Sequence, residues 1–235
     1  MSLLFRPIQS QMENKAATPG GLQRVLHSLL PPRCPGCDQP MVKPGLCNLC
    51  FRSLLPPSES FLNRSCFLYS GVLAQLIRGA KFMPSPPLAA ACLPLWEHAV
   101  LHERFYPLRE QISAITFVPS HWRRRMWRGF NLASLLAEKL SQAWSLPCTP
   151  LLRCRRFHAP LAKTIDRESR IRLVRNRFQM RKNAPPQPKE ILVVDDVMTT
   201  GSTLLEIGKV LKASGYVSRT LVLAQTPQFI SRQRS

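Results

Sequence analysis

The pattern of apolar and polar residues predicts alternating buried strands and amphipathic helices over most of the chain. Continuous apolar runs predict strands buried on both faces, as in a parallel sheet covered by helices. These runs lie at 66–69, 114–119, 191–194 and 219–224. Apolar residues at helical spacing predict helices at 22–30, 73–78, 88–101, 132–140 and 204–212, with a turn at 81–82. The order of elements predicts an α/β domain.

Length and charge limit the organisation and the partners of this domain. The 235 residues can hold one ordinary domain and a small module. We expect a mobile extension at 1–21, a short helix with a cysteine module at 22–57, and the main domain at 58–230. The formal net charge of +20 indicates a polyanionic partner, with nucleic acid considered before an anionic membrane or acidic metabolites. No apolar run approaches the ~20 residues of a membrane helix, which favours a cytoplasmic protein without membrane insertion.

The segment 191–203, ILVVDDVMTTGST, carries the most specific chemistry in the sequence. The strand is followed by two acids, a hydroxyl-rich turn with one glycine, and the start of a helix. Unpaired N–H groups at a helix start attract phosphate, and Gly201 permits close approach of the backbone. The paired acids would repel a phosphate unless they faced ribose hydroxyls or a magnesium ion. The segment predicts a ribose phosphate site, formed by Asp195, Asp196, Thr199, Thr200, Gly201, Ser202 and Thr203.

The segment has three other interpretations. A response-regulator receiver also has a strand ending in paired acids, but it carries them near the start of its domain. A P-loop ATPase requires the pattern G-x-x-x-x-G-K-[ST], which is absent from the sequence. A buried strand and a helix cap that bind nothing remain an alternative, although adjacent uncompensated acids are costly there.

Four of the eight cysteines form two CxxC pairs, Cys34-Pro-Gly-Cys37 and Cys47-Asn-Leu-Cys50. Each pair can aim two thiolates at one point, and four sulfurs complete the tetrahedral set that zinc prefers at about 2.3 Å. Four protein ligands leave no open position, so the predicted zinc is structural. A disulfide pair or a redox CxxC is the alternative.

Two basic segments predict a surface for single-stranded nucleic acid. Residues 122–128 combine four arginines with two tryptophans, which suits phosphates and stacked bases. Residues 153–182 hold eleven Lys or Arg against two acids, with a helix predicted at 166–178. The predicted nucleic-acid residues are Arg123, Arg124, Trp127, Arg128, Arg170, Arg172, Arg175 and Arg177. The alternative is a solvated basic face with the tryptophans in the core.

The segment 191–203 resembles the phosphoribosyl-diphosphate (PRPP) signature of type I phosphoribosyltransferases. The cysteine pairs, Lys81-Phe82, the RGFN sequence at 128–131 and the arginine-rich segment together resemble the ComF/GntX family of bacterial phosphoribosyltransferase-like proteins. The resemblance implies a type I phosphoribosyltransferase-like parallel sheet flanked by helices, preceded by the four-cysteine zinc module. The chain departs from the family pattern at Ala162 and Leu173, where relatives carry glutamine and asparagine.

The resemblance implies a protein of natural transformation with a PRPP pocket, a single-stranded DNA surface and contacts with DNA-uptake proteins. A metabolic phosphoribosyltransferase that uses PRPP with Mg²⁺ is the second hypothesis, with Arg124, Arg125 and Arg128 as candidates to neutralise the leaving pyrophosphate. A docking adaptor with a vestigial pocket is the third. Salvage enzymes with a similar motif place a carboxylate directly before the Thr-Gly, where this chain has Thr199.

Overall fold

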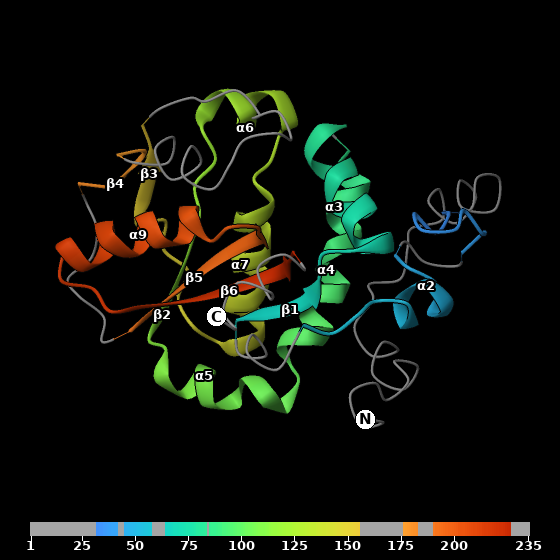
Figure 1. The fold of residues 1–235 in the computed structure, drawn as a ribbon, viewed down its shortest axis with the longest axis horizontal. Coiled ribbons are helices and arrows are strands. Elements are labelled where there is room, and N and C mark those ends of the chain that lie inside the picture. The colour runs from blue at the N-terminus through green and yellow to red at the C-terminus, as the bar shows by residue number, and fades with distance from the viewer. Residues whose placement is uncertain are drawn as a thin grey trace, which may run out of the picture.

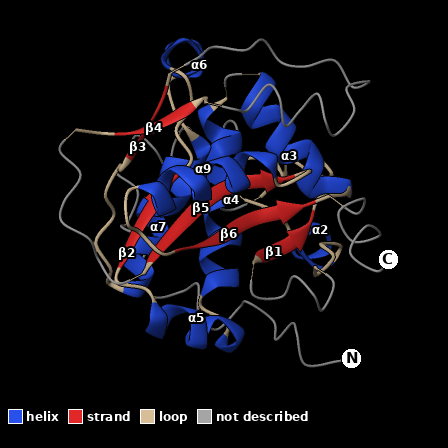
Figure 2. Ribbon diagram, turned by 60° about the vertical axis from the view of Figure 1, so that its left-hand side comes forward, coloured by secondary structure: helices blue, strands red, loops and turns tan. Residues whose placement is uncertain are grey.

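A parallel four-stranded sheet forms the centre of the fold in a computed structural model of the chain. The structure describes residues 32–41, 45–57, 64–83, 85–155, 176–182 and 190–226. The strand order is β1-β6-β5-β2, and neighbouring strands run side by side in one direction (Figure 2). The strands are β1 (Ser65–Leu68), β2 (Ala114–Phe117), β5 (Ile191–Met198) and β6 (Ser218–Gln225). The predicted parallel α/β sheet is confirmed.

Helices cover both faces of this sheet, and β5 lies at the boundary between two cores. Leu192 and Val194 pack into the larger core, whereas Ile191 and Val193 pack into the smaller one. The longest helices that pack into the larger core are α3 (Gly71–Phe82), α4 (Pro86–Val100) and α7 (Leu132–Trp144). Helix α9 (Ser202–Ala213) packs into the smaller core. Successive side chains of β5 point to opposite faces, which explains its uninterrupted apolar sequence.

The remaining elements lie around the sheet (Figure 1). They are α2 (Asn48–Arg52), η4 (Glu103–Phe105), α5 (Tyr106–Gln111), α6 (Trp122–Arg128), β3 (Leu152–Cys154) and β4 (Phe178–Met180). Strands β3 and β4 form a separate antiparallel pair. Among the described residues, no helix combines the length and the apolar character needed to span a membrane.

Two sequence predictions about local structure are wrong. The predicted turn at Lys81-Phe82 is the last turn of α3, because buried Ile77 and Ala80 extend its apolar face. The predicted helix at 166–178 does not reach its expected end, because Phe178 is the first residue of strand β4 and pairs with Cys154 of β3. Residues 166–175 lie outside the described residues, as do the predicted extension at 1–21 and the helix at 22–30.

The cysteine module is packed against the main domain. Phe51 and Leu54 belong to the same core as α3 and α4. The Phe51 ring meets His98 edge to face, with ring centroids 5.3 Å apart. The Leu55 carbonyl accepts a hydrogen bond of 2.8 Å from the N–H of Leu68 in β1. These contacts connect the module directly to the sheet and to α4.

Candidate functional site

The turn between β5 and α9 leaves the start of α9 open. Gly201 precedes the helix with φ of 72°, a left-handed conformation that glycine adopts without strain, and its carbonyl accepts a 2.9 Å hydrogen bond from Leu205. Gly201, at the cap position, offers no side chain to the helix, and the Thr200 hydroxyl accepts only a long hydrogen bond of 3.5 Å from the Ser202 N–H. The hydroxyl oxygens of Thr200 and Ser202 lie 3.0 Å apart. The following N–H groups in the first turn of α9 therefore remain available to a negatively charged ligand.

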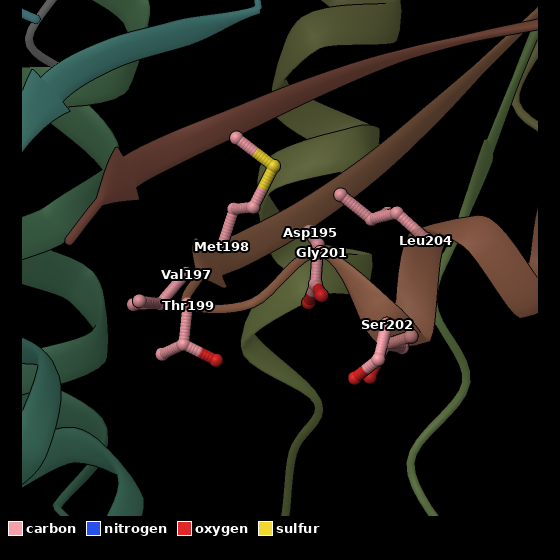
Figure 3. A pocket seen from close by; sticks show the side chains of 8 residues that line it. Asp195, Val197, Met198, Thr199, Gly201, Ser202 and Leu204 are labelled. Atoms are coloured by element: carbon pink, nitrogen blue, oxygen red, sulfur yellow. The ribbon is translucent and has the colours of Figure 1, made fainter. Parts of the chain in front are cut away.

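A small pocket, partly open to solvent, lies at this turn; it encloses about 20 Å³, and about 200 Å³ when the open solvent in front of it is included. Its lining residues are Asp195, Val197, Met198, Thr199, Gly201, Ser202, Thr203 and Leu204. Figure 3 shows the Asp195 carboxylate between Thr199 and Ser202. Five of the seven residues predicted for the ribose phosphate line this pocket, whereas Asp196 and Thr200 are not among its lining residues.

The two neighbouring acids face opposite sides of β5. Asp195 lines the pocket on the α9 side, and its Oδ1 accepts a 2.9 Å hydrogen bond from the N–H of Asp196. The Asp196 carboxylate instead accepts a 2.6 Å hydrogen bond from the Lys81 ammonium, which belongs to α3. The side chains of Asp196 and Lys81 are 11% and 25% exposed, so the pair is largely shielded from water.

The pKa values of this group follow from burial and from the close charges. Burial and the neighbouring Asp196 charge raise the pKa of Asp195 to about 8, against the opposing effect of Lys81. Burial favours a neutral Lys81, but the carboxylates of Asp196 and Asp195 outweigh it and raise the pKa of Lys81. Lys81 thus stays positively charged, while Asp195 can hold a proton at neutral pH.

Lys81 is a site residue to which the sequence analysis assigned no chemical role. It appeared there only as half of a family motif and as part of a predicted turn. Its partner Asp196 is separated from it by 115 positions, so no local pattern connects the two. The available signal was a lysine that follows buried Ile77 and Ala80 in the last turn of an amphipathic helix.

A second surface is formed by α6 and the end of α3. Trp122, Met126 and Trp127 are 54%, 77% and 56% exposed, and α6 has no buried residue in the described structure. The interpretation that these tryptophans lie in the core is therefore wrong. The Arg128 guanidinium carbon lies 5.9 Å from the ring centroids of both Trp127 and Phe82. We call these five residues the α6 surface.

Arginines gather beside the α6 surface. Burial lowers the pKa of Arg124, and the charges of Arg177 and Arg128 lower it further. Burial also lowers the pKa of Arg128, although Asp196 opposes this, and its buried Nε has no hydrogen-bond partner among the described residues. Arg177 comes from the turn before β4, and α6 lies between the β3–β4 pair and the end of α3 (Figure 1).

The other predicted nucleic-acid residues have varied positions. The Arg123 guanidinium lies 5.5 Å from the Trp122 ring centroid. Arg125, a candidate for pyrophosphate, is exposed on α6. Arg170, Arg172 and Arg175 lie outside the described residues, as do the departures at Ala162 and Leu173.

The four predicted metal ligands converge at one point. The sulfur atoms of Cys34, Cys37, Cys47 and Cys50 all lie within 4.8 Å of one another. Burial opposes ionisation of Cys34, but N–H groups including that of Cys47 lower its pKa to about 6. Four cysteine sulfurs this close together fit the tetrahedral set that zinc prefers. All eight cysteines are free of disulfide bonds in the structure.

The chain is similar in sequence to several known proteins. No model of a known protein family matches the chain. DNA utilization protein YhgH of Salmonella typhimurium is 32% identical over 188 residues, which are 77% of this chain and 78% of that protein. Competence protein F of Haemophilus influenzae is 36% identical over 105 residues, 44% and 45% of the two chains. Competence protein ComFC of Bacillus subtilis is 26% identical over 193 residues, 78% and 75% of the two.

Among solved structures, an adenine phosphoribosyltransferase is similar, with a TM-score of 0.41 and 17% identity over 70% of this chain and 81% of that one. The sequence relatives span most of this chain, and the two features that the resemblance implied, a helix-flanked parallel sheet and a four-cysteine cluster, are both present. The chain belongs to the ComF family.

Proposed function

We propose that this chain is a ComF-type protein of DNA uptake that binds PRPP or a related ribose 5-phosphate in the β5–α9 pocket. The observation that carries the proposal is the pocket itself, where the uncapped start of α9 and the Asp195 carboxylate face one cavity. A helix start suits the phosphate, and a carboxylate suits the ribose hydroxyls, which donate hydrogen bonds. One phosphorylated pentose satisfies both groups.

The ligand is held by backbone and side chain together. The first N–H groups of α9 and the hydroxyls of Thr199, Ser202 and Thr203 donate to the 5′-phosphate. Asp195 accepts from the ribose hydroxyls. When PRPP is the ligand, Mg²⁺ supplies charge neutralisation of the diphosphate, and the arginines of α6 add to it.

The α6 surface is the proposed site for single-stranded DNA. Its exposed indole rings offer faces on which bases stack, and the arginines beside it attract the phosphate backbone. Two relatives, named for DNA utilization and for competence, support a DNA ligand. The net charge of +20 supports it as well.

Phosphoribosyl transfer to a small acceptor is the second candidate function. Arg128 favours it, because a partly buried cation with an unpartnered Nε near Asp196 suits a leaving diphosphate. Thr199 argues against this function, because salvage enzymes carry a carboxylate base at this position and a threonine side chain has none. Pyrophosphate release from PRPP that requires both an acceptor base and Arg128 would select this function.

Calorimetric titration tests the pocket directly. We expect PRPP and ribose 5-phosphate to bind the wild type, and Asp195→Ala to weaken both by about 10- to 100-fold through loss of the hydrogen bonds between the Asp195 carboxyl group and the ribose hydroxyls. Lys212→Ala is the matched control, since Lys212 is exposed in the last turn of α9, and it should leave affinity unchanged. Absence of binding by the wild type, or full affinity in Asp195→Ala, would refute the pocket.

A further inference from the structure

Lys81 places a cation directly beside the acid pair of the pocket. Its Nζ lies 2.6 Å from Asp196 Oδ1, across from the pocket side of β5. Helix α3 holds it there, because Leu73, Leu76 and Ile77 on the same helix are fully buried. The ion pair with Asp196 and the buried face of α3 therefore hold the ammonium beside β5, with the Lys81 side chain 25% exposed.

The charges at the end of β5 explain why such a cation matters. Two ionised carboxylates beside a phosphate dianion repel it strongly when water is excluded. Proteins relieve this repulsion with a divalent metal or with a basic side chain. Here Lys81 cancels the charge of Asp196, and Asp195 can lower its own charge by holding a proton. The acid pair then presents little net negative charge to the pocket.

No other described group near Lys81 neutralises the charge of Asp196 in its place. Tyr69 lies close enough to affect its charge, but burial raises the pKa of that phenol and keeps it neutral. The charge of Asp196 opposes the lowering of the Arg128 pKa by burial, but no hydrogen bond joins the two side chains in the described structure. Lys81 alone among the described residues makes an ion pair with the acid pair.

We infer that Lys81 is a positioning residue that allows the pocket to bind ribose 5-phosphate without a divalent metal, by fixing and neutralising Asp196. This inference rests on the proposed function, because it specifies how the same pocket accepts its ligand. Mg²⁺ then serves only the diphosphate of PRPP. The pocket should accept the phosphorylated pentose itself in the presence of a chelator.

Calorimetry with ribose 5-phosphate, in EDTA and in Mg²⁺, tests the inference. The wild type should bind with equal affinity in both conditions. Lys81→Met should bind about tenfold more weakly in EDTA and regain affinity in Mg²⁺, because the metal replaces the lost cation. Lys81→Arg keeps the charge and should behave like the wild type. A wild type that requires Mg²⁺, or a Lys81→Met variant that binds normally in EDTA, would overturn the inference.

A double variant keeps the test valid if Lys81→Met fails to fold. Lys81→Met with Asp196→Asn removes both charges of the pair and leaves no uncompensated acid. We expect it to fold, as judged by its thermal transition, and to bind ribose 5-phosphate equally in EDTA and Mg²⁺. Metal-dependent binding by the double variant would also overturn the inference. If the wild type binds ribose 5-phosphate and PRPP in neither condition, the proposed function fails and the inference with it.

Discussion

Asp195 and Asp196 are adjacent in sequence but differ in environment, because a strand directs successive side chains to opposite faces. Asp195 lines the pocket, and Asp196 pairs with Lys81 on the other face of β5. The sequence analysis treated both acids as equivalent ligands of one sugar. The structure separates a residue that faces the pocket from one whose charge is already matched.

The raised pKa of Asp195 predicts a pH-dependent cost to folding. The native chain retains a proton on Asp195 up to a pKa of about 8, against the ordinary value of 3.8, so this group lowers stability progressively as pH rises between these values. Asp195→Asn removes the effect. We expect the melting temperature of the variant, relative to wild type, to rise between pH 5 and 8 and then level off. Each kcal/mol corresponds to roughly 2–4 °C in a chain of this size. A difference independent of pH would contradict the assignment.

Helix α6 is unusual among the elements because none of its side chains is buried in the described structure. Its formation follows from local signals. The His121 side chain accepts a hydrogen bond from the N–H of Arg123 at the start, and Gly129 ends the helix with φ of 79°. Such a helix contributes little to the core, so its exposed rings are available to a ligand.

Trp127→Ala tests this helix as a DNA surface. Loss of one stacking ring should weaken binding of a short single-stranded oligonucleotide by about 1–3 kcal/mol, or roughly 5- to 150-fold. Fluorescence polarisation provides the measurement. Val217→Ala is the control, because Val217 is 57% exposed just before β6 and away from α6. Equal losses in both variants, or none in Trp127→Ala, would exclude stacking on α6.

The contact between the cysteine module and α3 makes a prediction about zinc. A Cβ on Gly36 would lie 2.7 Å from Val72 Cγ1 and 2.8 Å from Cys50 Sγ, too close for either atom. We expect Gly36→Ala to destabilise the fold by about 1–3 kcal/mol and to lower the zinc content measured by mass spectrometry. Gly208→Ala meets nothing within 4 Å in α9 and should be stabilising by about 0.5–1 kcal/mol. Unchanged zinc and stability in Gly36→Ala would contradict the described packing.

Sequence patterns predicted the large elements but missed several small ones. The strand at 191–194 was found because four apolar residues follow one another, and the structure extends it to Met198. Strands β3 and β4 were missed because each has three residues, too few for a period-two pattern to emerge. Lys81 was missed because its partner is distant in sequence. The turn between β5 and α9 and the cysteine pairs were found because their residues are close together in the sequence.

Across the whole molecule, positive charge gathers beside the α6 surface. The charges of Arg177 and Arg128 lower the pKa of Arg124, and the charge of Asp196 acts on Arg128. Arg128 therefore belongs to the α6 surface and also lies near the face of β5 that carries Asp196, opposite the pocket. If α6 binds single-stranded DNA as proposed, Arg128 is a cation that the phosphates would meet.

The salt dependence of DNA binding tests the proposed role of Arg128. For single strands, each neutralised phosphate changes the slope of log K against log salt by about −0.7. Arg128→Ala should therefore make the slope less steep by roughly that amount, whereas the exposed Lys212→Ala should not. Polarisation titrations at several salt concentrations measure it. An identical slope for wild type and Arg128→Ala would exclude Arg128 from the DNA surface.

A crystal structure with ribose 5-phosphate bound would test the proposed β5–α9 pocket most sharply. We expect the phosphate to lie within hydrogen-bond distance of the Ser202 and Thr203 N–H groups, and a ribose hydroxyl to donate to the Asp195 carboxyl group. The Lys81–Asp196 ion pair should remain intact beneath the sugar. An empty β5–α9 pocket, or a ligand seated elsewhere on the chain at saturating concentration, would contradict it.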